Sequence, residues 1–369
     1  MSSTPAPSHG PAPLRTVQVL GGGSAGSSAH VRSLASGLVA RGVRVTVCAP
    51  EEVEHAYDFN GAGAAFLPVP RRSDPAAVAL LRAACASADV VHAHGLHAAT
   101  RTAMALRGRE VPFVFTWHSR SLAEGARAQV LRLMERRVTR ASAVVLGVCS
   151  ELVDRARRRG ARDARLTPVS VPAPRRFVPE KAHTEKSRAE LGVVGRPLVV
   201  AVGSLESHRG YSFLLDAAAT WRDLDPLPLL VIAGEGPERA ALQRRIEAEN
   251  LPVRLIGSRD DVPQLLAAAD LAVLPSRWEA RALLAQEALH AGVPLVATAV
   301  GGTPELVGDG AELVPYGDAW ALGEAVAHLL IDPARRRDLA AAGRAQAATW
   351  PTEDDTVAQT LSLYDELTQ

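Results

Sequence analysis

Residues 270–305, DLAVLPSRWEARALLAQEALHAGVPLVATAVGGTPE, decide the fold of this chain. The apolar run Leu271–Leu274 stops at a Pro-Ser pair, which predicts a buried parallel strand that ends in a loop. Alanine and leucine favour a helix over residues 282–290, and a glycine and a proline stop it. A second strand is expected at residues 293–297. This order of elements predicts an open α/β sheet with parallel strands.

Two carboxylates lie in this stretch at the predicted carboxyl ends of its strands. Glu279 is in the loop after the first strand, and Glu287 follows eight positions later in the helix. Gly301 and Gly302 follow the second strand, and their lack of side chains allows a ligand to approach the backbone closely. Open α/β sheets bind ligands outside the carboxyl ends of their strands, so we expect a binding site here.

The same alternation of strand and helix runs through the chain twice. With 369 residues, the chain suits two domains, each with parallel strands and right-handed crossovers. We expect a disordered tail at 1–13, a first domain at 14–170, a linker at 171–197, a second domain at 198–350 and a final helix in 351–369. The first series of expected strands is 17–21, 43–49, 65–69, 89–94, 112–117 and 143–148. The second series is 198–203, 228–233, 253–257, 271–274, 293–297 and 311–314.

Composition excludes several classes of function. The 41 basic and 40 acidic residues nearly cancel, which argues against a nucleic-acid partner. The two lysines, at 181 and 186, fall in the expected linker, so a pyridoxal phosphate Schiff base is not expected. Cys48, Cys85 and Cys149 are typical of buried free thiols in a reducing compartment. The N-terminus lacks the pattern of a signal peptide and no apolar run spans a membrane, so we expect a cytoplasmic protein.

The first loop, Gly21 to Gly26, matches the dinucleotide-binding pattern G-x-G-x-x-G between a strand and a helix. That pattern also needs an acidic residue at the end of the second strand, where this chain has Cys48-Ala49-Pro50 and only then Glu51. A nicotinamide-dependent oxidoreductase is therefore an alternative with weak support. A tight turn without a ligand is another.

Histidines gather at the end of the fourth expected strand, at His92, His94 and His97. Residues two apart on a strand share a face, whereas His97 begins a helix, so a metal site is the weaker interpretation. Ordinary histidines at a strand end remain an alternative to a functional role. His118 follows the next strand in the same way.

The stretch from Pro275 to Glu305 resembles the nucleotide-sugar-binding signature of retaining glycosyltransferases of family four. The resemblance extends from about Arg15 to the C-terminus. It implies the GT-B fold, in which two doubly wound, Rossmann-like parallel-sheet domains face each other across a cleft and the final helix packs back on the first domain.

The resemblance also implies roles for particular residues. Glu287 would hold the ribose of the donor, Glu279 the sugar hydroxyls, and Arg209 the diphosphate through its planar guanidinium fork. His118 would contact the transferred sugar, and His94 would lie on the acceptor side. The family usually has an arginine where this chain has Ser204, so one cation is missing here. The other residues implied in donor binding are Gly22, Gly23, Gly234, Glu235, Gly257, Gly301, Gly302 and Thr303.

These implications predict an enzyme that transfers a sugar from a uridine or guanosine diphosphate sugar to an acceptor hydroxyl with retention. The resemblance implies no metal and no cofactor besides the nucleotide sugar. A weak or inactive nucleotide-sugar binder is the main alternative because of Ser204. The arginine-rich segment 127–140 is either a solvated helix face or a peripheral contact with anionic lipid at the inner face of the membrane.

Overall fold

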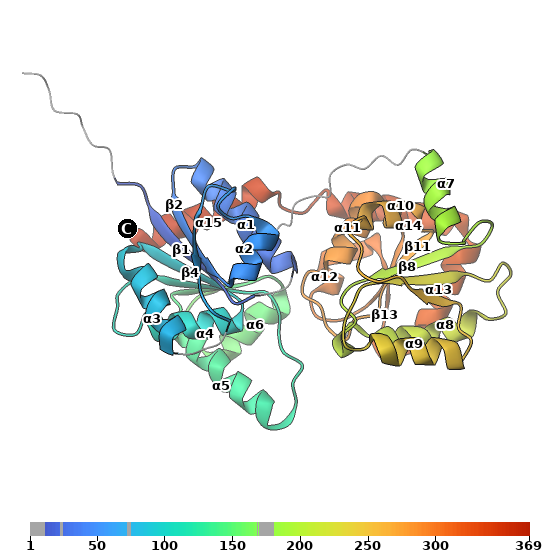
Figure 1. Ribbon diagram of the computed structural model, residues 1–369, viewed down its shortest axis with the longest axis horizontal. Coiled ribbons are helices and arrows are strands. Elements are labelled where there is room, and N and C mark those ends of the chain that lie inside the picture. Colours follow the sequence, from blue (N-terminus) through green and yellow to red (C-terminus); the bar gives the residue numbers. More distant parts are fainter. Residues whose placement is uncertain (1–11, 23–24, 72–74, 168, 170–180) are drawn as a thin grey trace, which may run out of the picture. The chain divides into compact units, whose positions relative to one another are not determined.

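The computed structural model describes residues 12–22, 25–71, 75–167, 169 and 181–369 (Figure 1). Most of the expected N-terminal tail, Gly23 and residues 171–180 of the expected linker lie outside this range. The chain divides into two compact units. The first comprises residues up to Pro172 together with Pro351–Gln369, and the second comprises Ala173–Trp350.

The first unit is built on a sheet of seven parallel strands in the order β3-β2-β1-β4-β5-β6-β7. The strands are β1 (Arg15–Leu20), β2 (Arg44–Ala49), β3 (Ala65–Pro68), β4 (Val90–His94), β5 (Phe113–Trp117), β6 (Val144–Gly147) and β7 (Ala164–Leu166). Strand order reverses between β1 and β4, which are paired with each other. In a doubly wound sheet, the carboxyl ends at such a reversal are where ligands bind.

Helices cover both faces of the first sheet. They are α1 (Ala25–Ala40), α2 (Glu51–Tyr57), α3 (Pro75–Ala84), α4 (Leu96–Ala105), α5 (Gly125–Ala141), α6 (Ser150–Arg159) and α15 (Glu353–Thr368). Helix α15, from the far end of the chain, packs beside α1 and buries Val357, Leu363 and Tyr364 in the core of this unit. Close packing requires Gly37 on α1, because a β-carbon there would lie 2.4 Å from a methyl group of Val357.

The second unit repeats the plan with six parallel strands in the order β10-β9-β8-β11-β12-β13. The strands are β8 (Leu198–Val202), β9 (Leu229–Ala233), β10 (Val253–Leu255), β11 (Leu271–Leu274), β12 (Leu295–Thr298) and β13 (Glu312–Val314). Its helices are α7 (Lys181–Glu190), α8 (Tyr211–Ala218), α9 (Arg239–Ala248), α10 (Val262–Ala268), α11 (Leu283–Ala291), α12 (Thr303–Val307), α13 (Ala319–Ile331) and α14 (Pro333–Ala347). Here the strand order reverses between β8 and β11.

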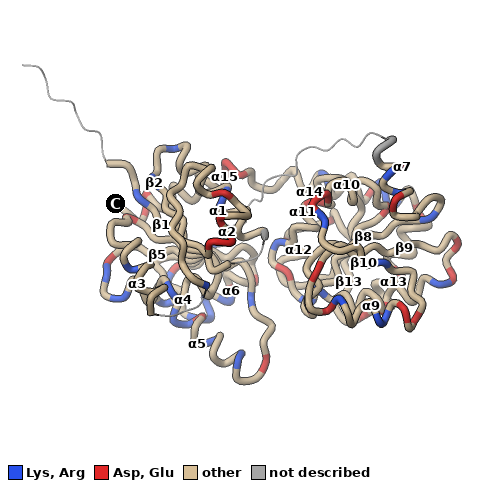
Figure 2. Tube along the Cα trace, in the orientation of Figure 1, with Lys and Arg blue, Asp and Glu red and all other residues tan. Residues whose placement is uncertain are grey.

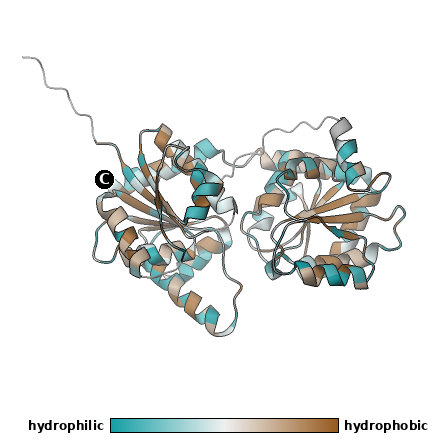
Figure 3. Cartoon of the chain, viewed as in Figure 1, coloured by the Kyte–Doolittle hydropathy of each residue, from teal (hydrophilic) through white to brown (hydrophobic). Residues whose placement is uncertain are grey.

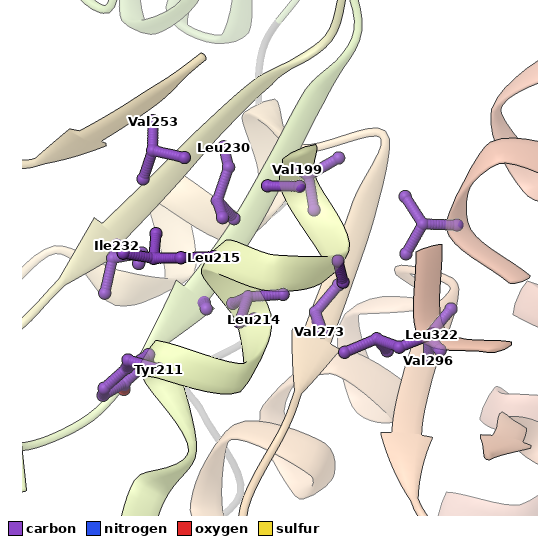
Figure 4. Close-up of a cluster of buried hydrophobic side chains, with 14 of the residues drawn as sticks. Val199, Tyr211, Leu214, Leu215, Leu230, Ile232, Val253, Val273, Val296 and Leu322 are labelled. Carbon is purple, nitrogen blue, oxygen red and sulfur yellow. The ribbon is translucent and has the colours of Figure 1, made fainter. Parts of the chain in front are cut away.

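Both units follow the expected distribution of polar and apolar residues. Charged residues lie mainly on helices and loops (Figure 2), whereas the central strands are strongly apolar (Figure 3). In the second unit, residues of α8, α9 and α13 pack on one face of the sheet, and residues of α10, α11 and α12 pack on the other. Figure 4 labels residues of α8 and α13 beside those of the strands. Within the described residues, no helix is both long and apolar enough to cross a membrane.

Two features differ from the sequence-based expectations. Strand β7 has three residues with Arg165 in the middle, and so short and polar a segment gives no strand pattern. Residues 181–197, expected to be linker, pack on the second unit instead. Helix α7 is anchored there because Arg188 donates 2.7 Å hydrogen bonds to the carbonyls of Ala268 and Arg196 and pairs with Asp270 at 3.0 Å.

Candidate functional site

The structure brings an arginine, a glutamate and a serine together at the carboxyl ends of β8 and β11. Arg209 Nη1 donates to Glu279 Oε1, and Ser276 Oγ donates to the same oxygen at 2.8 Å. Ser276 is fixed in turn because its carbonyl accepts a 2.6 Å hydrogen bond from Thr298 Oγ1. The site therefore holds a positioned carboxylate beside a guanidinium whose Nε is buried and makes no hydrogen bond within the described residues.

A close backbone contact holds the two loops together. Gly210, with φ of +72°, lies directly under the carbonyl of Pro275, and a β-carbon at this position would be 2.0 Å from that oxygen. The amide of Arg277 also donates to the carbonyl of His208 at 2.8 Å. These two contacts explain why Arg209 and Glu279, 70 positions apart, meet at one place.

Glu287 lies on α11, the helix that follows this loop, and is partly buried. Its carboxylate makes no hydrogen bond or ion pair with any residue that the structure describes. Burial raises the pKa of Glu287 to about 7. A half-buried carboxylate without donors is suited to accept hydrogen bonds from ligand hydroxyls, which would satisfy it.

The glycine turn after β12, which we expected to bind the donor, packs against the loop that carries Glu279. The amide of Gly302 donates to the carbonyl of Glu279 at 2.8 Å, and the amide of Thr303 donates to Val300 at 3.0 Å. A β-carbon on Gly301 would lie 2.0 Å from the Glu279 oxygen. The side chain of Thr303 is fully buried, and its Oγ1 makes no hydrogen bond within the described residues. The turn packs against the backbone of Glu279, so its geometry fits a role in positioning that residue.

The loops after β8, β9 and β10 pack closely on one another. A β-carbon on Gly234 would lie 1.9 Å from the carbonyl of Gly203, and its amide donates to Gly257 at 2.7 Å. Glu235 is exposed and pairs with Arg239 at 3.0 Å. Packing between loops therefore accounts for Gly234. The hydroxyl of Ser204 makes no hydrogen bond within the described part of the chain.

The first unit carries a second cluster, at the carboxyl ends of β4 and β5. His94 Nδ1 lies 3.3 Å from His118 Nε2, and the ring of His30 from α1 is within 6 Å of both ring centroids, at 5.8 and 5.7 Å. Gly22 lies after β1, where a β-carbon would approach the Arg71 guanidinium at 3.1 Å. Gly23 lies outside the described residues. The two histidines expected at the site are thus neighbours.

A buried hydrogen-bond network lies beneath these histidines. His94 Nε2 is 3.0 Å from Gln18 Oε1, and Gln18 Nε2 donates to Thr16 Oγ1 and Tyr364 Oη, both at 2.9 Å. His92 bridges Tyr364 Oη at 2.7 Å and Thr116 Oγ1 at 2.6 Å. Sequence reasoning missed Gln18, His30 and Tyr364, because no local pattern relates residues up to 346 positions apart.

Burial keeps these histidines neutral. It lowers the pKa of His92 to about 3 and the pKa values of His94 and His118 well below their usual value, with smaller repulsion among the rings. His97 is exposed and lies apart from the network. Within the described residues, no group of three or more His, Cys, Asp or Glu side chains could hold a metal ion.

The three cysteines are free and buried, as the sequence predicted. Burial raises the pKa of Cys48 to about 12 and that of Cys85 to about 11, so neither provides a thiolate near neutral pH.

Comparison with known proteins identifies the family. The model for glycosyl transferases group 1 matches residues 183–346, and the model for the glycosyl transferase 4-like domain matches residues 25–172. The alpha-maltose-1-phosphate synthase of Mycolicibacterium smegmatis is 30% identical over 311 residues, which cover 75% of this chain and 79% of that protein. The chain belongs to the group 1 glycosyl transferases.

Other members of the group 1 glycosyl transferases match over shorter regions. The alpha-D-kanosaminyltransferase of Streptomyces kanamyceticus is 32% identical over 234 residues, 60% of each chain. The 2-deoxystreptamine N-acetyl-D-glucosaminyltransferase of Streptomyces fradiae is 32% identical over 171 residues, 44% of this chain and 41% of that protein. The chain thus spans roughly half the length of these two relatives.

The fold of this group 1 glycosyl transferase is the GT-B fold. It superposes on the crystal structure of Anabaena HepE in complex with UDP-glucose with a TM-score of 0.80 and 20% sequence identity, covering 95% of this chain and all of HepE. This likeness confirms the predicted fold class of two parallel-sheet α/β domains.

Proposed function

We propose that this chain transfers a glycosyl unit from a nucleoside diphosphate sugar to an acceptor hydroxyl with retention of anomeric configuration. The observation that carries the proposal is the arrangement of Arg209, Glu279 and Glu287 at the reversal of strand order between β8 and β11. A cation and two separate carboxylates match a ligand with a diphosphate at its centre and hydroxyls at both ends.

In this proposal, the second unit holds the donor. The unpaired carboxylate of Glu287 accepts hydrogen bonds from the ribose, and Glu279 accepts them from the transferred sugar. Arg209 offers its guanidinium to the diphosphate and stabilises the charge that develops as this group leaves. The first turn of α11 offers backbone amides to the phosphates as well.

His118 of the first unit serves the transferred sugar, and His94 supports it from the acceptor side. The acceptor oxygen forms a bond to the anomeric carbon on the same face from which the diphosphate oxygen departs. The proton of the acceptor hydroxyl passes to the departing phosphate. The protein contributes positioning and charge stabilisation, and none of its side chains forms a covalent bond to the sugar.

The relatives support a nucleotide-sugar donor without fixing its base. Anabaena HepE was crystallised with UDP-glucose, whereas one mycobacterial relative is a GDP-mannose-dependent mannosyltransferase. A panel of uridine and guanosine diphosphate sugars, with and without sugar alcohol acceptors, tests the proposal through release of the nucleotide. Acceptor-dependent release supports transfer, and absence of release with every donor contradicts it.

Donor binding provides the second test. Calorimetry should detect binding to the wild type and none to Glu287→Ala, because the ribose hydroxyls lose their acceptor. A matched control is Glu247→Ala, which removes a carboxylate on α9 that bonds to Gln243 on the same helix. Equal donor affinity for Glu287→Ala and the control would exclude the proposed role of Glu287.

Ser204 favours a second candidate, a nucleotide-sugar-binding protein with little turnover. A serine cannot supply the positive charge that the family usually has at this position. This candidate predicts that calorimetry detects donor binding and that the wild type releases no nucleotide. It also predicts that Ser204→Arg restores nucleotide release. An oxidoreductase is excluded as a competing function by membership of the glycosyl transferase family.

Helix α5 is the part of the first unit that we propose to contact an anionic membrane surface. Val130 and Leu133 on this helix are each 58% exposed, although both are apolar. They lie among arginines, which Figure 2 marks in blue along α5. Vesicles rich in anionic lipid should retain the protein at low salt and vesicles of neutral lipid should not. Equal retention by both, or by neither, contradicts this contact.

A further inference from the structure

The side-chain amide of Gln18 has three hydrogen-bonding neighbours, and they restrict its orientation. Its nitrogen faces two hydroxyl oxygens, Thr16 Oγ1 and Tyr364 Oη, while its oxygen faces one ring nitrogen, His94 Nε2. Gln18 itself has no solvent exposure. Every hydrogen of its amide group must therefore find an acceptor inside the protein.

Counting donors decides the orientation. In the arrangement described, both amide hydrogens have an acceptor, and the amide oxygen accepts from His94. If the amide were reversed, its NH₂ group would face His94 alone and one buried N–H would be left without a partner. Because an orphaned buried donor is costly, the first orientation is favoured.

This orientation fixes the tautomers of two histidines in sequence. Gln18 Oε1 can only accept, so His94 carries its hydrogen on Nε2 and leaves Nδ1 bare. The bare Nδ1 of His94 can only accept from His118 Nε2, 3.3 Å away. A neutral His118 that carries its hydrogen on Nε2 has a bare Nδ1. That atom makes no hydrogen bond within the residues that the structure describes.

We propose that Gln18 is a positioning residue that sets the tautomer of His118 through His94, so that His118 presents its bare Nδ1 as a hydrogen-bond acceptor to a hydroxyl of the substrate. The inference rests on the proposed function for the identity of that hydroxyl. The substrate hydroxyl then donates to His118, and its oxygen stays free to accept from other groups. With the opposite tautomer, Nδ1 of His118 would carry a hydrogen and could no longer accept a hydrogen bond from the substrate hydroxyl.

The hydrogen bonds from Gln18 through His94 to His118 require neutral imidazole rings. Among the described residues, the titratable groups against His94 are His30 from α1, His92 from the same strand and His118, and those against His118 are His30 and His94. Tyr364 from α15 contacts His92. Burial and mutual repulsion lower the pKa values of His92, His94 and His118. The tautomers of His94 and His118 should therefore stay the same across neutral pH.

Nitrogen NMR of the full-length protein, labelled with ¹⁵N-histidine, tests the proposal directly. Spectra that correlate ring carbon-bound hydrogens with ring nitrogens separate a protonated from a bare nitrogen, and loss of one set of signals in His118→Asn assigns His118. We expect a protonated Nε2 and a bare Nδ1 in the wild type without substrate. A protonated Nδ1 on His118 would overturn the proposal.

Two variants separate positioning from general stability. Gln18→Met keeps the length of the side chain but removes its acceptor, so the His118 nitrogens should shift toward averaged, mixed-tautomer positions. Thr360→Val removes a buried hydroxyl of α15 that donates to the Thr356 carbonyl of the same helix at 2.8 Å, outside the network, so the His118 signals should stay as in the wild type. Unchanged His118 signals in Gln18→Met would refute the positioning role.

Steady-state kinetics measure how the hydrogen bonds from Gln18 to His118 affect the reaction. For Gln18→Met we expect kcat/KM to fall roughly tenfold, the value of about one hydrogen bond. Because the NMR experiment needs no substrate, the proposed tautomer of His118 and the proposed glycosyl transfer can be refuted independently. A protein that releases no nucleotide from any sugar but shows the expected tautomer would refute the proposed function alone.

Discussion

Replacing Glu287 with glutamine tests the electrostatics of the donor site without any ligand. The folded protein holds the Glu287 carboxyl at a pKa of about 7, against about 4.5 when it is exposed to water. The folded state therefore binds a proton at Glu287 more tightly than the unfolded state does. Stability from this residue is fully present below pH 4.5 and is lost as pH rises through 7.

The size of this loss follows from the two pKa values. Each factor of ten in proton affinity corresponds to roughly 1.4 kcal/mol, so ionising Glu287 should cost the folded state about 3 kcal/mol above pH 7. Glutamine has nearly the same shape and does not ionise. The stability of Glu287→Gln relative to the wild type should thus increase by about 3 kcal/mol between pH 4.5 and pH 8.

Urea unfolding at several pH values, followed by tryptophan fluorescence, measures this difference. Four of the five tryptophans, Trp221, Trp278, Trp320 and Trp350, belong to the second unit, so the signal reports mainly on the unit that contains Glu287. If the stability difference between the two proteins were the same at pH 5 and pH 8, the carboxyl could not be buried as described. In the wild type, donor affinity should also fall as pH drops below 7, because the protonated carboxyl is a poorer acceptor.

Three further substitutions test the packing and charge of the site. Gly210→Ala should lower the free energy of unfolding by about 1–3 kcal/mol and weaken donor binding, because its β-carbon meets the Pro275 carbonyl. The control is Gly195→Ala, at a glycine with φ of +74° and open space around it. Equal losses of stability in the two variants would contradict this prediction. Ser204→Arg should tighten donor binding about tenfold by calorimetry, whereas Ser204→Gln should not. Gly37→Ala should lower the melting temperature through its clash with Val357, and Gly26→Ala, unobstructed on the same helix, should not.

Much of the fold could be predicted because it depends on local patterns. The strand at Leu271–Leu274 was predicted with its observed bounds, since four apolar residues between a loop and a Pro-Ser pair leave little choice. Strand β7 was not, because Arg165 interrupts its three residues. Residues 181–197 were predicted to be linker because their charge hides the anchoring of Arg188 to the second unit.

The site was less accessible to sequence reasoning. Glu279 and Glu287 were found through a family resemblance, but their different environments, one paired and one unpaired, depend on the positions of Arg209 and Ser276 in space. The contact of Gly301 with the Glu279 carbonyl could not be predicted, because a glycine needed for a ligand and one needed for a neighbouring carbonyl look alike in sequence. The network around Gln18 depends on Tyr364, which only tertiary packing brings near.

Helix α15 has a consequence for the order in which this protein matures. The first unit completes its apolar core with Val357, Leu363 and Tyr364, which are synthesised after the whole second unit. On the ribosome, the first unit therefore keeps an exposed apolar surface beside α1 until the last residues of the chain have been synthesised. We expect a truncated product that stops before residue 351 to be prone to aggregation and a target for chaperones, even though its second half is intact.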